Sequence, residues 1–204
     1  MSVTIQDDFN KLTNLLCPGG EAAALRIFGP IGNVNDTDGA VAGTGVTISN
    51  EYVGHVHQTV ITLTNLAVTT TDATTNGAYG SQKIYDLPAG AMLTLGARTK
   101  LTITAAAGIS ASGTVKHALG TVAVSASDAL TSTLANILPS TNTTLSSSAG
   151  TGLGVSTAVC FADGTVTPVD VILNFGIADA STTTNSTLTV SGTITLTWIN
   201  LGTL

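Results

Sequence analysis

The stretch STLTVSGTITLTWINL, residues 186–201, alternates apolar and hydroxyl side chains with a period of two. Five of its large apolar residues fall on one side of an extended chain: Leu188, Val190, Ile194, Leu196 and Trp198. Successive side chains of a strand point to opposite faces, so the pattern predicts a long β-strand with one buried face. Residues 180–204 hold no charged side chain, although exposed edge strands are normally protected by charge. We therefore expect this strand to be central in its sheet or covered by another chain.

The same period runs through the chain from Val56 onward. Further strand-like runs are QTVITLTNLAV, AMLTLGARTKLTIT, GTVKHALGTVAVS, VSTAVCFA and VDVILNFGIA, separated by turns such as TNGAYG, LPAG and ADASTTTNS. About eight short strands with such turns predict an all-β fold, an antiparallel β-sandwich with jelly-roll topology. In residues 127–140, Leu130, Leu134 and Ile137 have helical spacing instead, which predicts a short helix or turn across one end of a sheet.

Residues 1–50 differ in sequence pattern from the rest of the chain. Phe9, Leu12 and Leu15 have helical spacing behind Asp7 and Asp8, and the pattern stops at CPGG, which predicts one short amphipathic helix. The following GPIGNVNDTDGAVAGTG (29–45) is a Gly-rich run without periodicity, typical of a loop. We therefore divide the chain into an extended N-terminal arm, 1–50, with a short helix and a Gly-rich loop, and a β-sandwich domain, 51–204.

Charge is scarce in this sequence. Charged residues make up 9% of the chain, against about 25% in typical domains, and the formal net charge is −6. All six basic residues lie within the first 116 positions, so we expect no nucleic-acid partner. Mean hydropathy is +0.42, but no stretch approaches the roughly 18 apolar residues of a spanning helix, so we expect no membrane partner. Arg98 and Lys100 share a strand face; a solvated edge is favoured over docking of an acidic partner.

Two histidines, His55 and His57, lie one residue apart in EYVGHVHQTV (51–60). On a strand they share a face and supply half of a tetrahedral metal shell. The remaining ligands would have to come from a distant strand, a carboxylate or symmetry, since a trimer axis here would gather six imidazoles. Polar side chains at the exposed start of a strand are the favoured interpretation, so we expect no metal.

No pattern in the chain predicts catalysis. GISASG (108–113) approaches a nucleophile elbow but places Ser112 where the second glycine belongs, and the nearby His117 is expected at the surface. GTGLG (150–154) lacks the helix and lysine of a phosphate-binding loop, so we interpret it as a flexible turn. NDTDG (35–39) lacks the further acidic ligands of a calcium loop. We expect no enzyme, no catalytic residue and no cofactor.

The chain contains two cysteines, Cys17 and Cys160. One disulfide is possible, but a chain of this size need not be stapled. Two small buried thiols are the favoured interpretation.

Three stretches carry a resemblance to a known family: GAYGSQKIYDLPAGAMLTLGARTKLTI (77–103), LTSTLANILPSTNTTLSSSAGTG (130–152) and VDVILNFGIADASTTTNSTLTVSGTITLTWINLG (169–202). Over about residues 56–202 the chain resembles virion proteins of tailed bacteriophages and prophages, a family thought to include capsid decoration (cement) proteins. The resemblance implies a non-enzymatic structural protein on the capsid surface. Its partners would be the major capsid protein and further copies of itself, with a homotrimer favoured.

A second function fits the same features. A tail or fibre component could contact glycans on the host surface, although aromatic residues, which sugar sites usually use, make up only 4% of the chain. We keep this alternative open beside the capsid-binding interpretation.

Overall fold

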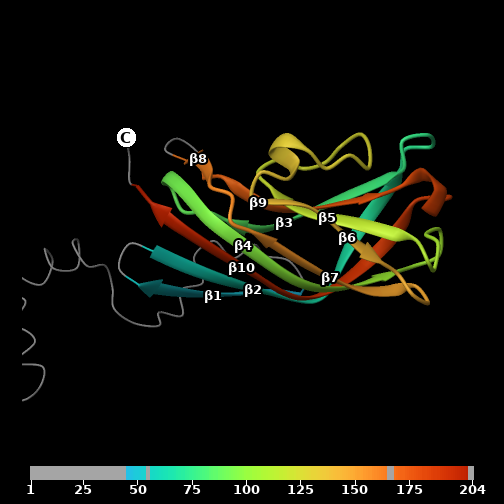
Figure 1. The fold of residues 1–204 in the computed structure, drawn as a ribbon, viewed down its shortest axis with the longest axis horizontal. Helices are drawn as coiled ribbons and strands as arrows, with labels where there is room; N and C mark the ends of the chain where they lie inside the picture. Colours follow the sequence, from blue (N-terminus) through green and yellow to red (C-terminus); the bar gives the residue numbers. More distant parts are fainter. Residues whose placement is uncertain (1–44, 54–55, 165–167, 202–204) are drawn as a thin grey trace, which may run out of the picture.

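The computed structural model describes residues 45–53, 56–164 and 168–201. Almost all of this part is antiparallel β-sheet, arranged as two facing layers (Figure 1). The strands are β1 (Val46–Val53), β2 (Val56–Asp72), β3 (Ala78–Asp86), β4 (Gly90–Ala105), β5 (Thr114–Gly120), β6 (Leu138–Thr144), β7 (Ala149–Ser156), β8 (Cys160–Gly164), β9 (Asp170–Ile177) and β10 (Ser186–Asn200). The expected helix of the arm lies outside the described residues. The expected boundary between residues 50 and 51 falls inside β1.

The two layers have the strand order of a jelly roll. Sheet A runs β1-β2-β10-β4-β7, with β8 also on β4, and sheet B runs β3-β9-β5-β6. The pairs are nested along the chain: β2 with β10, β3 with β9, β4 with β7 and β5 with β6. This is the pairing of one long hairpin rolled over into two sheets. The all-β sandwich expected from the sequence is therefore confirmed.

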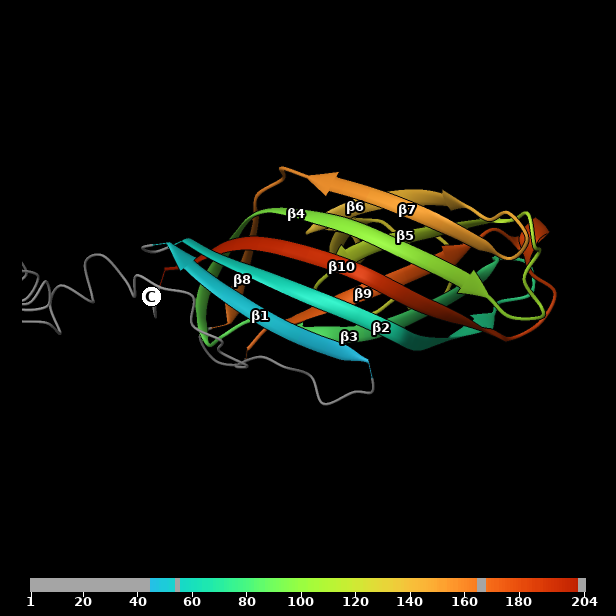
Figure 2. The ribbon, with the colours of Figure 1, turned by 90° about the horizontal axis from the view of Figure 1, so that it is seen from below.

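The decisive strand, β10, is central in sheet A, between β2 and β4 (Figure 2). All five of its expected core residues are at most 1% exposed. A central strand needs no protective charge, which accounts for the uncharged end of the sequence.

A shared β-bulge bends the paired strands β2 and β10. On β10 the register shifts between Val190 and Gly192, and on β2 the bend falls at Asn65, which has φ of 51°. The Ser191 hydroxyl donates to Asn65 Oδ1 at 3.2 Å and accepts from the Asn65 backbone N–H at 2.9 Å. The bend lets β2 end against β3, so the two layers form one curled sheet.

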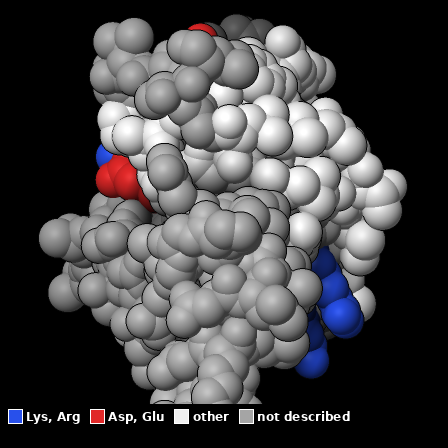
Figure 3. Space-filling view, turned by 90° about the vertical axis from the view of Figure 1, so that its left-hand side faces the viewer, with Lys and Arg blue, Asp and Glu red and all other residues white. Residues whose placement is uncertain are grey.

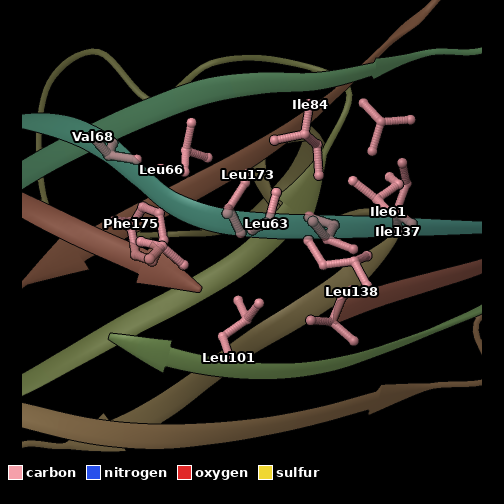
Figure 4. Packing of buried hydrophobic residues seen from close by; sticks show 14 of the residues in the cluster. Ile61, Leu63, Leu66, Val68, Ile84, Leu101, Ile137, Leu138, Leu173 and Phe175 are labelled. Atoms are coloured by element: carbon pink, nitrogen blue, oxygen red, sulfur yellow. The ribbon is translucent and has the colours of Figure 1, made fainter. Parts of the chain in front are cut away.

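The core lies between the sheets. Figure 4 shows side chains of β2 and β4, from sheet A, together with side chains of β9, Ile84 and Leu138, from sheet B. Buried apolar side chains of this kind supply most of the stability of such a fold.

The segment with helical spacing is short in the structure. Residues 132–134 form a 3₁₀ turn, Ser132–Leu134, and the chain then enters β6 at Leu138. A second 3₁₀ turn, Asp179–Ser181, connects β9 to β10. No helix in the described part of the chain has the length and apolar character to cross a membrane.

Candidate functional site

The outer face of sheet A is a regular array of hydroxyl, basic and apolar side chains. Strand pairing places Thr62, Thr193, Lys100 and Leu153 in one row across β2, β10, β4 and β7. Neighbouring strands are about 4.8 Å apart, so these residues adjoin one another. The next row runs through Val60, Thr195, Arg98 and Val155. Figure 2 shows this face of the sheet.

Four residues of this array form what we call the basic-apolar patch: Arg98, Lys100, Leu153 and Val155. Leu153 is 61% exposed and Val155 is 71% exposed, and they lie directly beside the two basic residues on β4. The expectation that Arg98 and Lys100 share an exposed strand face is confirmed, but that strand, β4, lies inside the sheet. Their neighbours are apolar side chains as well as water.

Arg98 and Lys100 also differ from the other basic residues of the described part. Lys83 binds Asp86 and Asp170 at 2.6 and 2.8 Å, and Lys116 binds Asp128 at 2.6 Å. Within the described ranges, no carboxylate forms an ion pair with Arg98 or Lys100. In the space-filling view, Lys and Arg side chains on one side of the molecule have no Asp or Glu of the described residues beside them (Figure 3).

A groove of about 510 Å³ crosses the same face where β4 changes its outer partner. β8 pairs with β4 as far as Thr94, and β7 pairs with it from Ala97 onward. Leu95 and Gly96 lie in the gap between β7 and β8, and Gly96 has no side chain to fill it. The groove is further lined by Gln58, Arg98, Ser156, Thr195 and Thr197, which provide amide, guanidinium and hydroxyl groups.

Among the described strands, none pairs with the outer edge of β7 beside this groove, and this edge of sheet A is uncharged. β7 is the last strand on this side, and residues 149–162 contain no charged side chain. Two further large apolar side chains follow Leu153 and Val155 along the chain, Val159 at 61% and Phe161 at 52% exposed, and we call these four residues the apolar strip. Uncharged open edges are unusual because they invite pairing with other chains.

GTGLG (150–154) is part of strand β7, so its interpretation as a flexible turn is wrong. Gly152 and Gly154 point inward, where β6 and His117 lie close. A Cβ at Gly152 would clash with Thr143 Oγ1 and would lie 2.8 Å from His117 Cε1. The glycines therefore serve close packing between the layers.

The prediction that His117 lies at the surface is also wrong. The residue is fully buried on β5, with Nε2 3.0 Å from Thr99 Oγ1 and Nδ1 3.5 Å from Thr143 Oγ1. Burial lowers its pKa to about 4, so the ring is neutral at pH 7. Val115 and Leu119, two residues away on either side, are buried too, and the strand period requires His117 to share their face.

His57 packs as a structural side chain. Its ring stacks on Trp198, with centroids 4.0 Å apart and planes at 7°. The Trp198 indole N–H donates to Thr59 Oγ1 at 2.9 Å, and Thr59 donates to Asn50 at 2.6 Å. His55 lies outside the described residues, and in the described part no group of three or more His, Cys, Asp or Glu is placed to hold a metal.

The remaining sequence candidates are spread over the fold. Ser112 lies in the turn between β4 and β5, away from His117. Cys160 is a buried thiol at the start of β8, and burial raises its pKa, while Cys17 lies outside the described residues. The NDTDG stretch at 35–39 also lies outside them. The groove could not be found from the sequence, because its position depends on which strands pair with β4.

Comparison with known proteins finds no relative of this chain by sequence. No protein family matches the chain, and no curated protein does. Among solved structures, it is similar to the N-terminal cellulose-binding domain of β-1,4-glucanase C from Cellulomonas fimi, at 15% identity and a TM-score of 0.31. The match covers 86% of this chain and 99% of that domain. Similarity at this level says nothing about ligand or partner.

Proposed function

We propose that this chain is a structural binding protein that docks on a larger protein assembly through the outer face of sheet A. The observation that carries the proposal is the exposed strip Leu153, Val155, Val159 and Phe161 along an open, uncharged sheet edge. Several large exposed apolar residues close together in the chain are typical of protein–protein contacts. The hydroxyl rows beside the strip add hydrogen-bonding groups that cost little to desolvate compared with charges.

The sequence resemblance supplies the identity of the assembly in this proposal. It is the head shell of a tailed bacteriophage, which the chain binds as a decoration (cement) protein at the capsid surface. The partners are then the major capsid protein and further copies of the chain, with a trimer favoured. Weak contacts repeated over an oligomer add up to strong retention on a shell.

Binding to purified shells tests the proposal. Val155→Lys places a charge in the strip and should reduce co-sedimentation of the full-length protein with shells by at least about tenfold, because a buried unpaired charge costs several kcal/mol. Val122→Lys is the matched control, since Val122 is also apolar and 46% exposed but lies beyond β5 on the sheet B side. Co-sedimentation that falls equally in both variants, or that does not fall in Val155→Lys, would contradict the proposal.

The copy number of the chain in virions tests the location separately. Hundreds of copies, relative to the major capsid protein, support a head protein, whereas a handful moves it to the tail. Light scattering on the purified protein measures the oligomeric state, and a monomer at micromolar concentration contradicts the trimer.

The groove favours a second candidate, a tail component that binds glycans. Its amide, guanidinium and hydroxyl groups can each hydrogen-bond a sugar hydroxyl. None of the described residues that line it is aromatic, so binding would depend on hydrogen bonds and on contacts with aliphatic side chains such as Leu95 and Val155. A glycan array decides: binding that is lost in Arg98→Ala supports this candidate, and absence of binding opposes it.

A further inference from the structure

The basic-apolar patch has a counterpart in the chain's own N-terminal segment. Asp7 and Asp8 stand directly before the apolar series Phe9, Leu12, Leu15 and Leu16. On sheet A, two basic residues stand directly beside two exposed apolar residues. Lys11 also lies within residues 7–16, so this segment has a formal net charge of −1 against +2 for the patch, and the two surfaces are opposite in sign.

Charge balance points to this segment as the occupant of the patch. Residues 1–44 hold five of the chain's twelve acidic residues and two of its six basic ones. The described ion pairs already use Lys83 and Lys116. Arg98 and Lys100 are the described basic residues left for the segment's carboxylates.

The described part of the chain also begins at a position from which the segment can reach the patch. Gly45, next in the chain, accepts a hydrogen bond at 2.7 Å from the backbone of Thr64 at the β2 edge. Thr47 then lies in register with Thr62, in the row that continues to Lys100 and Leu153. Crossing from β1 to β7 covers four strand spacings, about 19 Å, which about six extended residues can span. Residues 7–16 can therefore reach the patch without leaving their own subunit.

We propose that residues 7–16 of the chain dock on the basic-apolar patch of their own sandwich, with Asp7 and Asp8 against Arg98 and Lys100. Phe9 and the three leucines then cover Leu153 and Val155, which removes apolar surface from water. This docking goes beyond the proposed function and does not depend on it. If the face also binds a shell, the segment covers it until assembly, and shell and segment compete for the same side chains.

A crosslinking experiment on the full-length free protein tests the docking. Cys17 adjoins Leu16, so a thiol placed on the patch should lie near it. In the variant Val155→Cys with Cys160→Ser, mild oxidation should join Cys17 to position 155 within one chain, seen as a monomer on a non-reducing gel and as a crosslinked peptide by mass spectrometry. Val155 is 71% exposed, so the substitution should leave folding unchanged. The control is Val122→Cys with Cys160→Ser, which should crosslink far more slowly.

Three outcomes overturn the proposal. Equal crosslinking at positions 155 and 122 means that the segment has no preferred place. A crosslink that forms only between chains, and increases with concentration, means that a second copy supplies the segment. A patch variant with no crosslink leaves the segment elsewhere.

Charge reversal tests the assigned ion pairs. In the crosslinking variant, Arg98→Glu with Lys100→Glu should slow the crosslink by roughly two- to thirtyfold, the range expected for two exposed ion pairs. Adding Asp7→Lys and Asp8→Lys should restore the rate. Slowing without restoration would overturn the pairing of these four residues. Because no shell is present, these results are independent of the shell-binding test.

Discussion

The imidazole of His117 on β5 lies 3.0 Å from the hydroxyl of Thr99 on β4, so a titratable side chain joins the two sheets inside the core. Thr143 on β6 approaches the other ring nitrogen at 3.5 Å. The cluster is polar, and apolar side chains surround it. It stabilises the fold only while the ring stays neutral, because an unpaired charge there would be costly.

Stability should therefore fall as the pH drops from about 6.5 to about 4. The pKa of His117 is lowered by burial from 6.5 to about 4, so in this window the unfolded chain binds a proton that the folded chain excludes. The stabilisation that the neutral His117 ring contributes is present in full above pH 6.5, decreases as the pH falls below 6.5, and changes no further below about pH 4. The full loss is about 3 kcal/mol. Urea denaturation between pH 4 and 7.5, followed by Trp198 fluorescence, measures it.

The control for this prediction is His117→Gln, which keeps hydrogen-bonding groups but does not titrate. Its stability should be lower at pH 7 and should depend less on pH in the same window. A wild-type protein with constant stability from pH 7 to 4 would show that the buried ring accepts a proton without cost.

Both corrected predictions, at His117 and at GTGLG, concern the interior between β5, β6 and β7. The strand period places His117 with Val115 and Leu119, but polarity suggested the surface. Glycines at alternate positions are typical of turns as well as of strands that another strand approaches closely. Only the packing of β6 over β7 separates these cases, and that contact depends on the whole topology. By contrast, the burial of β10 follows from local alternation alone.

Thr59→Val should destabilise the protein by about 1–3 kcal/mol, the cost of leaving a buried donor without its acceptor. The change keeps the side-chain shape but removes the hydroxyl that accepts the indole N–H of Trp198 at 2.9 Å. Chemical denaturation followed by circular dichroism measures the loss. Thr59→Ser, which keeps the hydroxyl, should lose less. Thr193→Val, on the exposed face of the same sheet, should change stability by less than about 0.5 kcal/mol.

Gly152→Ala should destabilise the protein by about 1–3 kcal/mol through overpacking between the layers. The added methyl group meets Thr143 Oγ1, so Thr143→Ala should recover part of the loss in the double variant. A thermal denaturation cycle over the wild type and three variants measures the coupling. Strictly additive losses would show that the layers shift apart without contact between these side chains.

The sequence predicted the fold better than it predicted the candidate functional site. Alternation, turn residues and the uncharged carboxy-terminal strand predicted an antiparallel sandwich in which β10 is either central in its sheet or covered by another chain. The structure shows the first, with β10 between β2 and β4. The groove could not be predicted, because it lies at the gap where β4 stops pairing with β8 and starts pairing with β7. The alternation of residues within one strand does not show which strands pair with it. Arg98 and Lys100 were recognised as sharing a face, but their apolar neighbours come from a strand about fifty residues later in the chain.

Lys83→Met should lower stability modestly, by less than about 1 kcal/mol, because the three groups are more than one-third exposed. The lysine lies between Asp86 and Asp170, which face each other in register on β3 and β9. Hydrogen bonds to Asp170 and then Asp86 raise the pKa of Lys83, so both partners contribute. Without the ammonium group, two carboxylates repel across the strands, and salt screens that repulsion. The difference from wild type in urea denaturation should therefore shrink between 0.05 and 1 M NaCl, while Lys83→Arg should remain close to wild type. A loss that salt leaves unchanged would point instead to the packing of the lysine's methylene chain.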